Sequence, residues 1–171
     1  MSRYTIDPGR TTVWIEARSS LHPIHSESRG MEGYFDGEVG ADGLLDLSSP
    51  LGAHLELSIA KMSSGNGLYD REMMRRVEAR HFPVITAELR QLTAAEAMGS
   101  YVAEGDITFR GVTQRVRDEV TFSRPEVGTV VFEGKHVFSL RDFKMEPPKI
   151  MMLRVYPDVT VRVRIVARAE G

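Results

Sequence analysis

The chain has 171 residues, of which 42% are hydrophobic and 27% are charged, and its formal net charge is −2. This length suits one domain over residues 1–171 with a sizeable core, and the near-neutral charge gives no reason to expect nucleic acid or an anionic membrane as a partner. Because the chain contains no cysteine, disulfides, thiolate metal sites and cysteine nucleophiles are excluded, and a reducing compartment is favoured.

The first twenty residues carry several charges, among them Arg3, Asp7, Arg10 and Glu16, and contain no apolar stretch of the kind found in secretion signals. The sequence also shows no apolar run of the length that spans a bilayer. We therefore expect a cytoplasmic protein that does not insert into a membrane.

Alternating apolar and polar residues predict a series of strands along the chain. The last strand is the clearest, because Val159, Val161, Val163 and Ile165 alternate with mostly polar residues. We expect eight strands joined mainly by short turns, at residues 12–18, 33–39, 53–59, 84–92, 101–109, 112–122, 129–138 and 155–168.

The passage between the third and fourth of these strands has a helical pattern instead. Tyr69, Met73 and Val77 are spaced four residues apart, so they share one side of a helix. Acidic residues come early in this passage and arginines late, as the helix dipole favours, and Pro83 is expected to end the helix. We predict one or two short helices near residues 68–82 that cover the open mouth of a barrel.

The predicted strands indicate an all-β protein. Eight sequential antiparallel strands close readily into an up-and-down barrel, which is either filled by side chains or holds one small ligand. A β-sandwich built from the same strands fits the pattern equally well, so the pattern by itself leaves both architectures open.

Four segments resemble a known family in the right order. They are Tyr4-Thr5-Ile6-Asp7 with Val13-Trp14-Ile15, then Asp70-Arg71 and Phe82-Pro83 with ten residues between them, then Gly105-Asp106-Ile107-Thr108 with Gly111-Val112-Thr113, and finally Leu140-Arg141-Asp142-Phe143. Together they resemble the YceI-like family of lipocalin-like lipid-binding proteins. The resemblance implies a single antiparallel eight-stranded lipocalin-like barrel. One departure is Lys144, which stands where the family has glycine; lysine carries a cost there if the position needs a positive φ.

The strand at residues 129–138 supplies the first candidate site residues. Phe132, His136 and Phe138 fall on alternate positions, so they share the inward face. His136 can anchor the head group of a ligand, or it can be a core histidine satisfied by a neighbouring hydroxyl or carbonyl. The second situation is the commoner one.

Further candidates come from a histidine pair and from the start of the helix. His22 and His25 form an H-x-x-H pair, but Pro23 prevents a regular helix, so we expect no metal site and place the pair in a loop or at the barrel mouth. Arg71 can meet an anionic head group, or it can pair with a barrel carboxylate such as Glu88.

The chain has nine methionines, a high number for its length. Methionine is flexible and polarisable, so it suits a cavity for a long apolar ligand as well as an irregular core. Met74 lies on the predicted helix. Met145 and Met151 lie in or beside the loop of residues 145–150, between the last two predicted strands. With them, the candidate ligand-binding residues are His22, His25, Arg71, Met74, Phe132, His136, Phe138, Met145 and Met151.

The resemblance implies that the barrel binds a long-chain apolar small molecule, namely a polyisoprenoid, an isoprenoid quinone, or a fatty acid or amide. We expect no cofactor, no metal and no catalytic residues, because the sequence has neither a nucleophile motif nor a phosphate-binding glycine loop. Two alternatives stay open: a cavity-based lyase, cyclase or hydrolase, and a filled barrel with a structural or interaction role. Related barrels often pair, so a homodimer is a further expectation.

Overall fold

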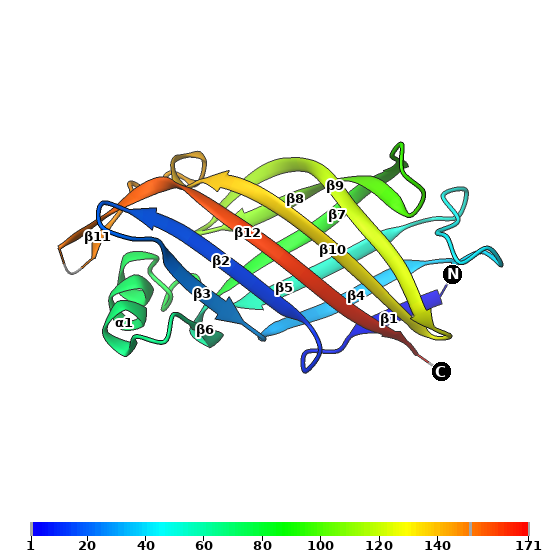
Figure 1. Cartoon of the computed structure of the whole chain (residues 1–171), viewed down its shortest axis with the longest axis horizontal. Helices are drawn as coiled ribbons and strands as arrows, with labels where there is room; N and C mark the ends of the chain where they lie inside the picture. Colours follow the sequence, from blue (N-terminus) through cyan, green and yellow to red (C-terminus); the bar gives the residue numbers. More distant parts are fainter. Residues whose placement is uncertain (1, 151, 171) are drawn as a thin grey trace.

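The computed structural model describes residues 2–150 and 152–170, and its strands form an antiparallel sheet that curls into an elongated barrel (Figure 1). The helical elements are α1 (Gly67–Arg76) and two short 3₁₀ turns, η1 (Ile59–Lys61) and η2 (Leu140–Phe143). The strands are β1 (Ser2–Ile6), β2 (Thr12–Ser19), β3 (Ile24–Ser28), β4 (Met31–Gly37), β5 (Gly52–Ser58), β6 (Met62–Ser63), β7 (Val84–Ala94), β8 (Ser100–Phe109), β9 (Val112–Glu126), β10 (Thr129–Ser139), β11 (Lys149–Ile150) and β12 (Leu153–Ala169).

The barrel closes because the last strand pairs with strands from both parts of the chain. One edge of β12 pairs with β10, and the other edge pairs first with β2 and then with β1, where Tyr4 lies opposite Ala169. β1 and β2 therefore lie end to end, and β3 and β4 lie end to end beside them. Counted in this way, the wall has eight antiparallel strand positions in chain order, and the predicted barrel is confirmed.

A buried threonine bridges the break between β1 and β2. Thr11 has no exposed surface (0%), and its hydroxyl accepts a hydrogen bond from the Val166 N–H at 3.0 Å and donates to the Val166 carbonyl at 3.2 Å. Val166 lies in β12 where the partner changes from β2 to β1. The side chain thus supplies the bonds that a strand would otherwise make, because buried backbone groups must be paired.

The helix lies across one end of the barrel, beside β3 and β6 (Figure 1). Asn66 caps its start, because its side-chain oxygen accepts hydrogen bonds from the N–H groups of Leu68 and Tyr69. The helix ends at Arg76 and not at the expected proline, since Glu78 takes a positive φ of 57°. A left-handed residue at this place commonly ends a helix, and the residues from 77 to 81 form turns.

The observed strands include four short ones that are not among the eight expected from the alternation, namely β1, β3, β6 and β11. β3 contains His25, so this histidine lies in a strand and not in a loop. The segment is rich in serine and glutamate, and it becomes a strand because its backbone pairs with β2 on one side and with β6 on the other.

Candidate ligand-binding cavity

The barrel encloses an apolar cavity of about 440 Å³, a volume typical of small-molecule sites. The inward residues of the long strands line it, as their alternation requires. Nearly all of these side chains are aliphatic, aromatic or methionine; they include Ile15, Phe35, Leu55, Leu57, Ile85, Leu89, Ile107, Phe109, Phe132, Phe138, Val159, Val161, Val163 and Ile165.

Small inward residues make the room in the middle of the barrel. Ala87, Ala103, Gly105 and Gly134 all line the cavity. At residue 105 the strands also approach closely, since a Cβ built there would lie 2.5 Å from the carbonyl oxygen of Glu88. A larger side chain at these positions would fill the cavity or push the wall outward.

Aromatic side chains close the end of the barrel opposite α1. The ring centroids of Phe35 and Phe132 are 4.9 Å apart, those of Phe122 and Phe132 are 5.2 Å apart, and Tyr101 follows at 6.4 Å from Phe122. The connection between β4 and β5 folds over this cluster, where the Leu45 N–H donates to the Tyr101 hydroxyl at 3.1 Å. Leu45 is only 6% exposed, so this end is sealed.

The other end is covered by two segments that one arginine ties together. Met73 of α1 and Val77, which caps the end of that helix, reach the cavity. Phe143 of η2 and Met145 in the loop after it reach the cavity as well. Arg110, in the turn between β8 and β9, donates to the Glu78 carboxylate at 2.9 Å and to a backbone carbonyl of the η2 loop, that of Lys144, at 3.4 Å.

All three linked residues have left-handed backbones, with φ of 57° at Glu78, 52° at Arg110 and 58° at Lys144. This conformation costs an L-residue other than glycine about 1–2 kcal/mol, and such strain persists only where the surroundings fix it. Lys144, which stands where the family has glycine, therefore does take a positive φ, so the conformational cost considered from the sequence applies to it.

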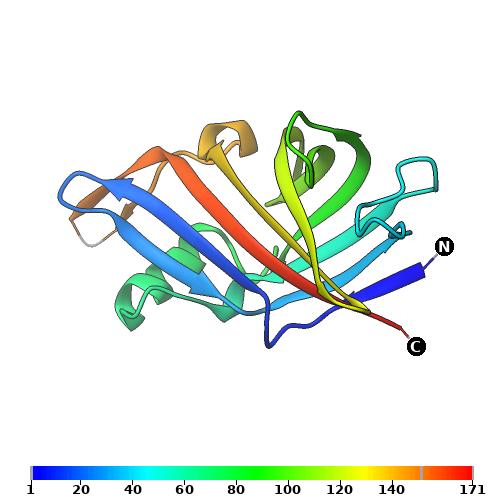
Figure 2. The ribbon, with the colours of Figure 1, turned by 45° about the vertical axis from the view of Figure 1, so that its right-hand side comes forward.

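The wall is not continuous between β9 and β10. The two strands pair from their hairpin as far as Gly134 and Val120, and no further backbone pairing joins them within the described residues. Figure 2 shows them diverging away from the hairpin. Beyond that point a side-chain contact crosses the gap, in which His136 Nδ1 lies 2.8 Å from a carboxylate oxygen of Asp118.

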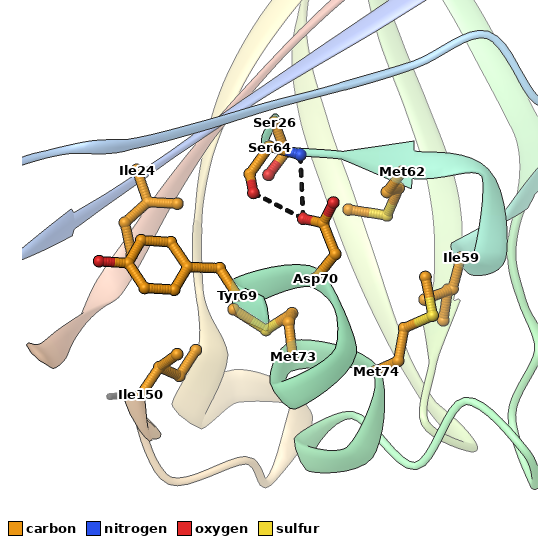
Figure 3. Close-up of a pocket in the computed structure, with 10 residues that line it drawn as sticks. All are labelled: Ile24, Ser26, Ile59, Met62, Ser64, Tyr69, Asp70, Met73, Met74 and Ile150. Atoms are coloured by element: carbon orange, nitrogen blue, oxygen red, sulfur yellow. Dashed lines mark hydrogen bonds between the residues drawn. The ribbon is translucent and has the colours of Figure 1, made fainter. Parts of the chain in front are cut away.

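A second, much smaller pocket of about 30 Å³ lies between α1 and the strands β3 and β6 (Figure 3). That volume accommodates about one water molecule, so it cannot hold the expected ligand. Asp70 lies in this pocket and accepts hydrogen bonds from the Ser64 N–H at 2.9 Å and from the Ser64 hydroxyl at 2.6 Å. These bonds fix the start of the helix to the segment after β6.

The candidate residues fall into three groups in the structure. Phe132, His136, Phe138 and Met145 line the cavity. Met74 lines only the small pocket in Figure 3. His22, His25 and Arg71 are exposed and line neither pocket. Met151 is not among the described residues.

The H-x-x-H pair does not converge on a common point. His22 Nδ1 lies 3.0 Å from the carbonyl oxygen of Pro23, whereas His25 Nδ1 lies 4.0 Å from the Glu16 carboxylate on the neighbouring strand. Across residues 2–150 and 152–170, no group of three or more His, Asp or Glu side chains is arranged to hold a metal ion.

A histidine with a shifted pKa lies on the outer face of the wall. His54 contacts the carboxylates of Glu56 and Glu88, and its hydrogen bonds to Glu56 and then to Glu88 raise the pKa of the imidazole. Its strand neighbours Ala53 and Leu55 line the cavity, so His54 points away from it. His54 itself is not among the residues that line the cavity, although its partner Glu88 is.

Two residues at the cavity boundary escape prediction from the sequence. Asp118 continues the inward alternation of Val116 and Val120, and that alternation is the signal that could have found it. Arg110 has no such signal, because its role depends on Glu78 and on the η2 loop, which are distant in the sequence.

Comparison with protein families matches residues 4–167 to the YceI-like domain. No match is found among curated proteins. None of the helices in the described part of the chain has the length and apolar character needed to cross a membrane.

Solved structures with the same fold are distant in sequence. Burkholderia cenocepacia BcnA is 16% identical, with a TM-score of 0.79 over 95% of this chain and 99% of that one. A polyisoprenoid binding domain from Saccharophagus degradans, implicated in plant cell wall breakdown, is 13% identical, with a TM-score of 0.78 over 98% of both chains. The Campylobacter jejuni YceI protein is 12% identical, with a TM-score of 0.69 over 86% of both.

Proposed function

The chain belongs to the YceI-like family, and from this premise we propose that its barrel binds and sequesters a long-chain apolar small molecule without transforming it. The observation that carries the proposal is the apolar cavity of about 440 Å³ inside the barrel. The ligand class is a polyisoprenoid, an isoprenoid quinone, or a fatty acid or amide. Similarity in fold to the polyisoprenoid binding domain from Saccharophagus degradans supports the first of these.

Burial of the ligand's apolar chain supplies the binding free energy. Each methylene removed from water contributes about 0.8 kcal/mol, and association costs roughly 4–15 kcal/mol. A water molecule takes about 30 Å³ in the liquid. If a methylene group takes about the same room, a cavity of about 440 Å³ holds roughly fifteen of them. The gross gain in binding free energy is then about 12 kcal/mol. After the cost of association is subtracted, binding stays favourable only when the ligand fills most of the cavity.

The polar groups favour a binder over an enzyme. An enzyme that uses this cavity would gather its polar groups around a reacting atom in the interior. Here the polar lining residues, such as Glu88, Glu104 and Lys135, are spread along several strands. Asp118 and His136 also line the cavity and contact each other at the gap in the wall, where their side chains are 47% and 31% exposed. A polar group at the rim of an apolar site orients a ligand.

A filled structural barrel is disfavoured for a separate reason. Its bulky side chains would meet across the barrel axis along the whole length. Here large rings meet near the two ends, around Phe35 and Phe132 at the sealed end and around Phe143 at the other, and the cavity lies inside the barrel. Residues 1–171 acting as one binding domain, a cytoplasmic location and a homodimer stay predictions from the sequence.

The experiment is native mass spectrometry of freshly purified protein, followed by organic extraction and identification of the bound compound. We expect an adduct with the mass of a prenyl or acyl chain. A clean apo mass that does not shift with added quinones, polyprenols or fatty acids would contradict the proposal.

A further inference from the structure

The gap between β9 and β10 opens the side of the barrel directly into the cavity. In the described residues, no backbone pairs join residues 112–119 of β9 to residues 135–139 of β10, although β9 stays paired with β8 and β10 with β12. Backbone N–H and C=O groups left on two facing edges need water or another partner. The cavity lining includes Val116, Asp118 and His136, which flank this gap on both sides.

Contacts at both ends define the extent of the gap. At one end Gly134 pairs with Val120, so closely that a Cβ on residue 134 would lie 3.1 Å from Val120 Cγ1. At the other end the Gln114 side-chain amide donates to the Asp142 carbonyl of η2 at 2.7 Å. The opening is therefore bounded by side-chain and backbone contacts and is not a frayed end of the hairpin.

The two ends of the barrel are less suited to passage of a ligand. The end that carries Tyr101 and Leu45 is sealed by aromatic rings and a folded connection. The α1 end is held by Arg110, which links the turn after α1 to the loop after η2. Across the lateral gap, by contrast, we find the single side-chain contact of Asp118 with His136 among the described residues.

The geometry points to a lateral portal between β9 and β10, through which the apolar chain of the ligand passes. At this portal the pair of Asp118 and His136 holds an uncharged hydrogen-bonding head group, such as a hydroxyl, carbonyl or amide. This inference rests on the proposed function and names the place and head-group class of that same site.

The chemistry of the pair selects the head group. Nδ1 of His136 is occupied by Asp118, while Nε2 has no hydrogen-bond partner among the described residues and can bind a ligand oxygen or N–H. The neighbouring carboxylate of Asp118 carries a negative charge and repels a carboxylate or phosphate at this point. Glu119 and Lys135, the next residues along the two edges, also line the cavity. Their opposite charges offset each other, so the negative charge of Asp118 stays uncompensated by them.

Cross-linking tests the portal cleanly because the chain has no cysteine of its own. Continuing the register from Gly134 and Val120 places Arg117 and Val137 opposite each other on the outer face of the gap. The variant Arg117→Cys/Val137→Cys is closed with a short bismaleimide. The matched control is Thr121→Cys/Glu133→Cys, an outward pair in direct register on the same two strands.

The readout is stopped-flow exchange of N-phenyl-1-naphthylamine, a neutral apolar fluorescent probe. We expect the cross-link at 117 and 137 to slow both binding and release by about ten-fold or more, with little change in Kd, because a blocked passage changes rates and not the bound state. The control cross-link and the unlinked variants should exchange the probe at the wild-type rate. Unchanged rates in the 117/137 cross-linked protein would overturn the portal.

Head-group preference is measured by displacing the same probe with hexadecanol, hexadecanamide and hexadecanoate. We expect the neutral compounds to bind at least about five-fold more tightly than the acid. In His136→Phe, with each affinity referred to the Kd of that variant for the probe, most of that preference should be lost. Equal affinity for all three compounds would overturn the head-group assignment. If wild-type protein binds neither the probe nor any of the three, the proposed function itself fails, which is a distinct result.

Discussion

Replacing Ala87 by phenylalanine should shorten the longest alkyl chain that the barrel can bury. Ala87 faces the cavity from β7, between Leu55 of β5 and Ile107 of β8, which also line it. A phenyl ring there extends into the cavity from β7, which β8 separates from β9. The substitution therefore changes the capacity of the site and leaves the portal and its polar pair intact.

The size of the effect follows from the cavity volume. A cavity of about 440 Å³ holds roughly fifteen methylene groups at about 30 Å³ each. The added ring takes the room of roughly three or four of these groups. Since each methylene contributes about 0.8 kcal/mol, or about four-fold in Kd, chains long enough to fill the wild-type cavity should bind roughly 100-fold more weakly to Ala87→Phe.

The assay is displacement of a bound fluorescent probe by a series of n-alcohols of increasing length. Wild-type affinity should rise about four-fold per methylene and level off near fifteen carbons, whereas the Ala87→Phe series should level off near eleven or twelve. Gln91→Phe is the control, since Gln91 is exposed on the same strand and its replacement should leave the wild-type length limit in place. An unchanged length limit in Ala87→Phe would show that the ligand does not occupy this cavity.

Three further predictions concern stability. Lys144→Gly should raise the free energy of unfolding by about 0.5–1 kcal/mol, because glycine adopts the positive φ without the strain that lysine bears; thermal unfolding measures it, and no gain would mean that the loop relaxes the strain in another way. Thr11→Val should cost about 1–3 kcal/mol, since the buried N–H of Val166 loses its hydroxyl partner, while Thr11→Ser should retain most of the stability in urea unfolding; equal losses in both would contradict the bridging role. Because hydrogen bonds to Glu56 and to the second neighbouring glutamate raise the folded-state pKa of His54, the stabilisation it provides is fully present below its unfolded pKa of about 6.5 and is lost as the pH rises through the raised folded-state pKa. The difference in unfolding free energy between wild type and His54→Gln should therefore be larger at pH 6 than at pH 9, by up to about 1 kcal/mol for so exposed a cluster, and a difference independent of pH would argue against it.

The strands could be predicted because they follow a strict alternation, whereas the choice of a barrel over a sandwich depended on the resemblance to the YceI-like family. On β10, Phe132, His136 and Phe138 face the cavity as their spacing indicates, and β12 places Val159 and Val161 in the same way. Period-two alternation fixes which side of a strand each residue occupies, so the inward set follows from the sequence once the strands are recognised.

The covered end could not be predicted in the same way, because its structure depends on contacts between distant segments. The helix ends early where Glu78 adopts a left-handed backbone, and that residue is held by Arg110 from another hairpin. The gap in the wall was equally hidden. Nothing in the alternation of β9 shows that its pairing with β10 stops at Val120, since an unpaired strand edge and a paired one have the same pattern of side chains.

The pairing of Tyr4 with Ala169 has a consequence for how the protein is made. Synthesis proceeds at about 5–20 residues per second, so β1 waits roughly 8–33 s before the strand that it joins in the closed wall has emerged. During that time β1 and β4 form an unprotected sheet edge, which is the kind of surface that promotes aggregation. The same delay means that the closed cavity does not exist until β12 has been made and has paired with β2 and β1.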